Sequence, residues 1–270
     1  MSAVPPAAPT LLPPSKSVER HGRLLLVPAP LDFGCKQQVA LERVMPEATL
    51  LEASRLTHWI CENAKSARAY LKRISGIHPL PVRLQDLNVQ ELPHAVHKKG
   101  DHDRAFDPQA LLKPALSGHD IGLVSEAGMP AIADPGSSVV RAAHRMGLEV
   151  IALVGPVSLM LALAQSGFNG QNFAFVGYLP QESQARLKRL RELESLCSKL
   201  GQTQMFIETP YRNANLLQAL IQNLAPATRL SVSYGLTLPG GRTISGTIAE
   251  WRKGHWAPDS SLPAVFAIGR

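Results

Sequence analysis

Five short segments rich in glycine and proline are the parts of this chain best suited to holding a ligand. Each follows a stretch that we predict to be a strand, and ligands of open α/β sheets bind beside the carboxyl ends of the strands. If these segments line one crevice, the site consists largely of backbone donors and acceptors, with few fixed side-chain charges. The segments are 28–30, 125–128, 155–158, 177–180 and 208–212.

The segment that follows the apolar run 121–124 indicates the charge of the ligand. Gly128 allows the backbone to approach a ligand closely. Glu126 and Asp134 bring negative charge, whereas a phosphate-binding loop would offer a lysine, so these residues favour a ligand that carries positive charge. An ordinary strand-to-helix connection fits the same residues equally well, because glycine and proline punctuate most such loops.

The sequence lacks the motifs of several other kinds of site. The chain has no GxxxxGK[ST] phosphate loop, no GxGxxG after the first predicted strand and no GxSxG turn for a nucleophilic serine. His94, His97 and His102 match no zinc spacing, so we expect no metal. The cysteines form no CxxC pair and indicate reduced thiols in a cytoplasmic protein: Cys35, Cys61 and Cys197.

The charge balance indicates an anionic partner. The chain carries 28 lysines and arginines against 21 acidic residues, a formal net charge of +7, which modestly favours nucleic acid as partner, because many enzymes carry such a charge for solubility alone. Lys98, Lys99 and Arg104 lie in a polar segment and are candidates for phosphate contacts, whereas the basic cluster at 186–191 is either a solvated helix face or an RNA-facing patch. No apolar run approaches the roughly 20 residues that span a bilayer, so we expect no membrane partner.

The pattern of apolar and turn residues predicts an α/β fold with two domains. We expect a disordered arm at 1–22, an N-terminal domain at 23–170 and a C-terminal domain at 171–270, where closely spaced strands predict a mixed sheet with antiparallel pairs. The predicted strands are 23–27, 48–52, 81–84, 121–124, 149–154, 173–176, 204–208, 229–236, 243–247 and 263–268. The predicted helices include 35–45, 57–74, 107–116, 158–165 and 183–200.

The helix after the segment at 125–128 has its own start signal. We predict that it begins at Ser137 or Ser138, with Asp134 as N-cap and Pro135 at the first helical position. For Asp134, we expect a structural role as N-cap rather than contact with a ligand.

Four motifs of this chain resemble those of one family. SEAGMPAIADPG resembles the SDAGTPxISDPG motif of the tetrapyrrole methylase superfamily, in its branch of ribosomal-RNA 2′-O-ribose methyltransferases. VGPVS, GYLP and ETPYR are similar to PGPSA, GFLP and ESPHR of that branch. Order and spacing agree over 23 to about 250, and the match is strongest to a group of shorter methyltransferases within the branch.

The resemblance implies two α/β domains with a cofactor cleft between them, a homodimer, and S-adenosyl-L-methionine as cofactor. It implies substrate contacts by Tyr211 and Arg212 and names no catalytic base. For Glu208, a cap on the following helix and a place in the cleft remain equally open. The residues that it places on the cofactor are Pro28, Ser125, Glu126, Ala127, Gly128, Pro156, Val157, Ser158, Gly177, Tyr178, Leu179 and Glu208.

The chain also departs from the family pattern, mostly on the side of the methyl acceptor. The TPxGNLxDxT motif after the first strand is VPAPLDFGCKQ here, and Tyr211 stands where ESPHR has histidine. Our leading hypothesis is therefore an S-adenosylmethionine-dependent methyltransferase acting on RNA, plausibly ribosomal RNA. The alternatives are methylation of a small molecule such as a tetrapyrrole, and a cofactor-binding protein that no longer catalyses.

Overall fold

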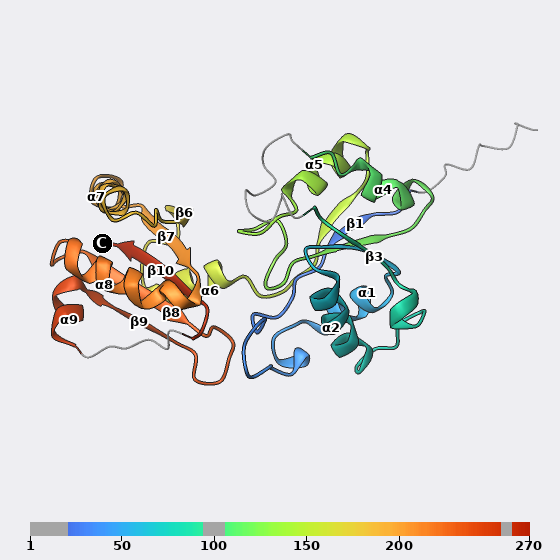
Figure 1. The fold of residues 1–270 in the computed structure, drawn as a ribbon, viewed down its shortest axis with the longest axis horizontal. Helices are drawn as coiled ribbons and strands as arrows, with labels where there is room; N and C mark the ends of the chain where they lie inside the picture. Colours follow the sequence, from blue (N-terminus) through green and yellow to red (C-terminus); the bar gives the residue numbers. More distant parts are fainter. Residues whose placement is uncertain (1–20, 94–105, 255–260) are drawn as a thin grey trace, which may run out of the picture.

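The chain folds into two halves, each built around a five-stranded sheet (Figure 1). The computed structural model describes residues 21–93, 106–254 and 261–270. Residues 1–20 of the predicted disordered arm lie outside the described residues, and so do His94, His97 and His102, together with the basic residues between 98 and 104. The predictions made for these residues stay predictions.

The first sheet is parallel throughout, in the order β3-β2-β4-β1-β5. Leu24 pairs with both Ile121 and Val150, so β1 lies in the sheet interior beside β4 and β5. Parallel strands end at the same edge of a sheet, and the segments that follow them therefore gather there. The strands are β1 (Leu24–Leu26), β2 (His58–Cys61), β3 (Asn88–Glu91), β4 (Ile121–Val124) and β5 (Val150–Ala152).

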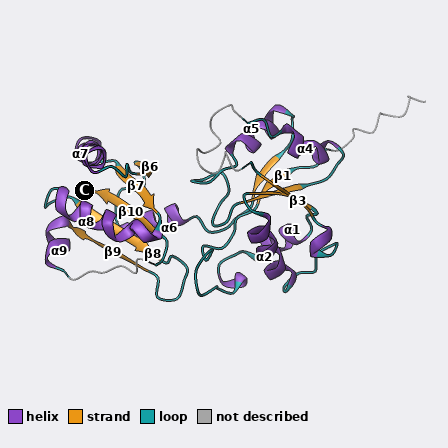
Figure 2. Ribbon diagram, viewed as in Figure 1, coloured by secondary structure: helices purple, strands orange, loops and turns teal. Residues whose placement is uncertain are grey.

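Helices cover both faces of the first sheet (Figure 2). On one face, Trp59 and Leu71 belong to an apolar cluster with α1 (Glu47–Ser54) and α2 (Ala64–Ser75). On the other, Ile60 packs with α4 (Gln109–Leu116) and α5 (Ser137–Arg145). Burial on both faces explains why the interior strands β1 and β4 are continuous apolar runs, whereas the edge strand β3 is mostly polar. Two short 3₁₀ helices, η1 (Leu41–Arg43) and η2 (Leu84–Asp86), complete this half.

The second sheet is mixed, in the order β6-β7-β10-β8-β9. β6 and β7 are parallel and the other pairs are antiparallel, which confirms the predicted mixed sheet. Its strands are β6 (Phe173–Tyr178), β7 (Thr203–Glu208), β8 (Arg229–Tyr234), β9 (Arg242–Thr247) and β10 (Ala264–Gly269). One face is covered by α7 (Ser183–Leu200), α8 (Asn213–Asn223) and α9 (Ile248–Lys253), with η3 (Pro210–Arg212) leading into α8.

The helix α6 (Ser158–Ser166) covers the other face of the second sheet, although it directly follows the last strand of the first. Leu159 and Leu163 pack in a cluster with Val265 of β10. Leu31 of the first half belongs to the same cluster, so the two halves share apolar contacts. The domain boundary predicted at residue 170 stays a prediction, and α6, which precedes it, contacts the second sheet.

Two predicted elements near the N-terminus are wrong. Residues 35–45 form no α-helix and contain only η1, because Asp32 accepts a hydrogen bond from the Val39 N–H, which holds this segment as a loop. Residues 48–52 belong to the helix α1 rather than to a strand. A short apolar run does not distinguish strand from helix, and the alanines, leucines and glutamates of this segment are strong helix formers.

Two further boundaries are corrected. The helix predicted from residue 57 begins at Ala64, because Asn63 caps it by accepting hydrogen bonds from the backbone N–H groups of Lys65 and Ser66. The residues before the cap form β2 instead. The strand predicted at 81–84 lies later, as the edge strand β3 at Asn88–Glu91.

The helix after β4 begins at Ser137, as predicted, but Asp134 is not its cap. The N-cap is Gly136, whose φ of 138° is available to glycine and rarely to other residues. Asp134 and Pro135 lie in the loop that precedes it. Asp134 is thereby left available for another role.

We predict that Gly122→Ala lowers the free energy of unfolding by about 1–3 kcal/mol, because a methyl group overpacks this site. A Cβ atom at Gly122 would lie 2.6 Å from the indole ring of Trp59 and 3.0 Å from Leu56, both buried. Urea unfolding measures the change. Gly170→Ala is the control, since its Cβ would meet no atom within 4 Å; equal stability losses in the two variants would contradict the prediction.

Candidate functional site

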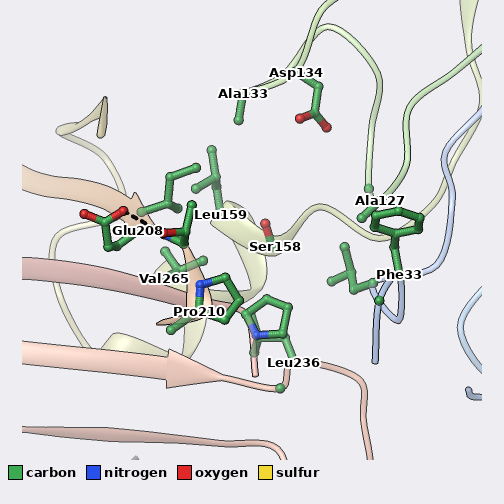
Figure 3. Close-up of a pocket in the computed structure, with 18 of the residues that line it drawn as sticks. Phe33, Ala127, Ala133, Asp134, Ser158, Leu159, Glu208, Pro210, Leu236 and Val265 are labelled. Carbon is green, nitrogen blue, oxygen red and sulfur yellow. Dashed lines mark hydrogen bonds between the residues drawn. The ribbon is translucent and has the colours of Figure 1, made fainter. Parts of the chain in front are cut away.

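A cavity of about 440 Å³ lies between the two halves, and segments of both line it (Figure 3). The first half contributes the loops after β1 and β4. The second contributes the ends of β6 and β7, the turn after β8 and the start of β10, while the N-terminus of α6 closes the wall between them. Sites of this size, between units and at strand ends, are typical of ligands as large as a nucleoside.

Half of the residues predicted to hold a cofactor line this cavity. They come from three segments after β4, before α6 and at the end of β6, and from the end of β7. The structure thus brings four of the five glycine- and proline-rich segments to one hollow. The residues are Ala127, Gly128, Val157, Ser158, Tyr178 and Glu208.

Backbone pairing and close packing hold these segments together. The Ala29 N–H donates to the Gly128 carbonyl over 2.9 Å, and the Gly128 N–H donates back over 3.0 Å. Gly155 lies so close to the ring of Pro28 that a Cβ atom there would fall 2.2 Å from the Pro28 Cγ. The segments after β1, β4 and β5 therefore form one unit, and glycine is required where they touch.

The other predicted residues lie beside the cavity and do not line it. Ser125 and Glu126 line a second cavity, and Leu179 is buried in the core of the second half. Cofactor contacts by these residues remain predictions. The full set is Pro28, Ser125, Glu126, Pro156, Gly177 and Leu179.

The second cavity, of about 380 Å³, lies in the first half and adjoins the first. Phe33 and Gly34 line both cavities, so the turn after β1 forms their common wall. Arg73 donates two hydrogen bonds of 2.9 Å to the buried carboxylate of Asp32, which fixes this turn. The Ser125 hydroxyl lines the second cavity, is buried, and has no hydrogen-bond partner among the described residues.

Several cavity residues were not predicted from sequence. Phe33 lies within the motif after the first strand, which has diverged from the family pattern, and Leu236 lies in the turn after β8. Val265 reaches the site because β10 inserts between β7 and β8, which no local pattern indicates. Asp134 is predicted from sequence as an N-cap. Its position in the acidic loop after β4 is the signal that could have indicated a place in the cavity wall.

Asp134 is a half-buried carboxylate on the cavity wall, and its environment is unfavourable for a negative charge. Burial is the main cause that raises its pKa, to about 7, and the neighbouring carboxylates of Glu62 and Glu126 add to the rise. Figure 3 shows its side chain extending from the loop toward the open space above Ser158. No hydrogen bond or ion pair joins it to another described residue.

Glu208, by contrast, is a paired carboxylate. Its Oε1 atom accepts hydrogen bonds from Arg212 Nε at 2.9 Å and from the Thr209 N–H at 2.8 Å. The helix α8 begins without a side-chain cap, so Glu208 lines the cavity and does not cap that helix. The Arg212 guanidinium lies 5.0 Å from the ring centre of Tyr211, whose side chain is 75% exposed. Neither Tyr211 nor Arg212, the two residues predicted to contact the substrate, lines the cavity.

Within the described residues, no group of three or more histidine, cysteine or acidic side chains is arranged to hold a metal ion. Nor does any helix in these ranges combine the length and apolar character needed to cross a bilayer.

Comparison with known families identifies the fold. The sequence profile of the tetrapyrrole (corrin/porphyrin) methylases matches residues 49–251, which is most of the chain. The chain belongs to this family. The match includes the loop after β4, the N-terminus of α6 and the ends of β6 and β7. These are the segments that meet at the cavity.

Curated relatives of this tetrapyrrole methylase carry the name ribosomal RNA small subunit methyltransferase I. The protein from Vibrio cholerae is 34% identical over 154 residues, which is 57% of this chain and 51% of the relative. The protein from Bacillus subtilis is 31% identical over 181 residues, 67% of this chain and 60% of the relative. The chain thus spans about half to three fifths of the length of the relatives it matches.

Solved structures support the same fold at lower sequence similarity. The methyltransferase CobJ superposes with a TM-score of 0.54 at 15% identity, over 92% of this chain and 94% of CobJ. A uroporphyrin III C-methyltransferase from Thermus thermophilus has a TM-score of 0.50 at 16% identity, over 92% of this chain and 98% of the other. These likenesses establish the fold, an α/β architecture shared with tetrapyrrole methylases.

We predict that Asp134→Asn stabilises the fold more at pH 8 than at pH 5. The pKa of Asp134 is raised to about 7 by burial, so the folded state binds this proton more tightly than the unfolded state does. The free energy of unfolding of the wild type therefore falls as the pH rises from about 4 towards 7. The variant has no ionisable group at this position, so it avoids that fall. Urea unfolding at both pH values measures it. Asp86→Asn, an exposed site away from the cavity, is the control; an equal gain at both pH values for Asp134→Asn would contradict the prediction.

Proposed function

We propose that this protein is an S-adenosyl-L-methionine-dependent methyltransferase that acts on RNA, and we favour the ribose 2′-oxygen of ribosomal RNA as acceptor. The observation that carries the proposal is the cavity between the halves, whose walls include four segments that lie within the family match. The relatives' name supports RNA as the substrate class. The chain spans only 51–60% of the length of those relatives, so their activity is a proposal for this chain.

The cavity residues suit this cofactor in size and in charge. A volume of about 440 Å³ lies within the range of small-molecule sites. Gly128, with a φ of 72°, lines the cavity without a side chain, so a ligand can approach closely the backbone segment that pairs with Ala29. Among the described residues, no lysine or arginine lines the cavity, as a phosphorylated ligand would require, and Asp134 faces it with negative charge.

The proposed chemistry is methyl transfer, in which the cofactor supplies an activated methyl group on a positively charged sulfur. The task of the chain is to hold the acceptor atom in line with the methyl group, since positioning contributes most of the rate of such a displacement. Ala127, Gly128 and Ser158 would hold the cofactor from the first half and α6, and Tyr178 and Leu236 from the second. A catalytic base remains unassigned.

The second cavity is our proposed position for the methyl acceptor. It adjoins the first cavity at Phe33 and Gly34, so a nucleotide bound there would have to extend its acceptor oxygen past this turn to meet the methyl group in line. The unpartnered Ser125 hydroxyl offers a hydrogen bond to a polar acceptor, and the exposed Lys65 offers a positive charge at the rim. This combination suits a nucleotide better than an apolar ligand.

Surface features support RNA over a small acceptor. The net charge of +7 favours attraction to a polyanion. Tyr211 is exposed beside Arg212 near the end of β7, and an exposed aromatic ring with an arginine is a platform on which a nucleic-acid base can stack. We also propose a homodimer, which rests on the family resemblance, and a cytoplasmic location, which follows from ribosomal RNA as substrate.

The proposed function predicts transfer of labelled methyl groups from S-adenosylmethionine to RNA. Small ribosomal subunits from a strain that lacks this gene, their naked RNA and a porphyrinogen are the acceptors to compare, with the label counted in each. We expect label in RNA, removed by ribonuclease digestion. Label in the porphyrinogen alone would support the small-molecule alternative, and binding of S-adenosylhomocysteine without any transfer would support a non-catalytic protein; either result contradicts the proposal.

We further predict that Gly128→Ala weakens binding of S-adenosylhomocysteine by at least about tenfold, the equivalent of 1.4 kcal/mol. The added methyl group occupies space at the cavity wall that the ligand needs, and its Cβ would lie in contact with Leu31 at 3.4 Å and the Pro156 carbonyl at 3.7 Å. Isothermal titration calorimetry measures the affinity. Gly147→Ala is the matched control, because Gly147 has a similar φ of 69° and open space around it.

Both variants place a side chain in the left-handed region and should lose similar stability. Only Gly128→Ala should lose affinity, because Gly147 does not line the cavity. Unchanged affinity in Gly128→Ala would contradict the placement of the cofactor.

A further inference from the structure

Asp134 lines the proposed cofactor cavity and has no hydrogen-bond or ion-pair partner among the described residues. Asp134 and Glu208 are the only acidic or basic residues of the described chain that line this cavity. Glu208 is paired with Arg212 at 2.8 Å. Asp134 makes no hydrogen bond or ion pair with a described residue. The mostly apolar cavity wall therefore holds one ionisable carboxyl group that no neighbouring cation balances.

The groups around Asp134 increase this imbalance. Glu62 follows β2 and Glu126 follows β4, and both carboxylates act on Asp134 with the same sign of charge. Tyr178, at the end of β6, faces the same space; partial burial raises the pKa of its hydroxyl, and the charges of Asp134 and Glu208 add to the rise. These are the titratable groups of the described residues that face Asp134, and none of them is a cation.

Asp134 is also excluded from a structural role that would explain its position. It does not cap α5, whose N-cap is Gly136, and its loop holds two non-glycine residues, Ala131 and Ala133, at a positive φ of 65°. Backbone of this kind costs free energy and is retained where the surrounding structure or a function requires it. The loop thus places an unpaired carboxylate in a cavity at some cost in stability.

We propose that Asp134 recognises the positive charge of the cofactor's sulfonium group, and so distinguishes S-adenosylmethionine from S-adenosylhomocysteine. This inference rests on the proposed function and adds to it a specificity-determining residue. The methylated cofactor carries a cation where the demethylated product carries a neutral thioether. A carboxylate without a partner attracts the first and gains nothing from the second, so the site favours substrate over product.

Proton linkage follows from the same contact. Burial and the neighbouring carboxylates raise the pKa of Asp134 to about 7, so the free protein holds this group partly protonated at neutral pH. A cation bound beside it favours the charged form, and a proton is released on binding. The affinity for S-adenosylmethionine, divided by that for S-adenosylhomocysteine, should rise about fivefold from pH 6 to pH 8 if the preference at pH 8 is about tenfold. The ratio cancels titration of the amino group that both ligands share.

The test is calorimetric binding of three ligands to the full chain: S-adenosylmethionine, S-adenosylhomocysteine and sinefungin, which carries an amine in place of the sulfonium. We expect the wild-type protein at pH 8 to bind both cations about tenfold more tightly than the thioether. Asp134→Asn should lose this preference while it keeps its affinity for S-adenosylhomocysteine. Asp86→Asn, exposed and away from both cavities, should retain the wild-type preference.

Each other outcome overturns the proposal in a distinguishable way. If Asp134→Asn weakens both cofactor forms equally, the residue binds a group that they share, such as the amino group. If the preference is absent in the wild type, or persists in the variant, Asp134 does not recognise the sulfonium. If no ligand binds to any form, the proposed function fails together with the inference.

The wild-type protein alone provides a second test that does not depend on folding of a variant. Titrations at pH 7 in two buffers of different ionisation enthalpy measure protons released on binding. We expect more proton release with S-adenosylmethionine than with S-adenosylhomocysteine. Equal release with the two ligands would overturn the proposal.

Discussion

The close packing of Gly155 on the ring of Pro28 is the constraint on which the site depends. A side chain at residue 155 would collide with that ring, so the segment after β5 lies directly on the segment after β1. The chain then enters α6 within a few residues and packs on the second sheet. Because Leu31 also joins the apolar cluster of that sheet, the two halves are held at a fixed separation, and the cavity is the space that remains.

Charge is distributed unevenly over this scaffold. The chain as a whole is basic, with a net charge of +7, yet the cavity wall presents acidic groups and, among the described residues, no lysine or arginine. The opposite signs suit the two ligands of the proposed reaction, because RNA is a polyanion and the methyl donor carries a cation. Asp134 is the acidic group of this wall that has no cation beside it, and burial raises its pKa to about 7, so that it is only partly ionised in the free protein at neutral pH.

Local signals allowed much of the fold to be predicted from sequence. Strand β4 and helices α5 and α7 were located correctly because apolar runs and breakers marked their ends. Residues 48–52 were assigned wrongly because a five-residue apolar run fits a helix as well as a strand. Phe33 and Val265 reach the cavity through the packing of distant segments, and the unpaired state of Asp134 depends on which groups surround it; neither is encoded in a local pattern.

A crystal structure with S-adenosylhomocysteine bound tests the central claim most directly. The account predicts that the nucleoside lies in the cavity between the halves, with Gly128 and Ser158 on one side and Tyr178 and Leu236 on the other. Its sulfur should face Asp134 and the turn at Phe33 that separates the two cavities. A ligand bound in the second cavity, or held by residues of one half alone, would contradict the account.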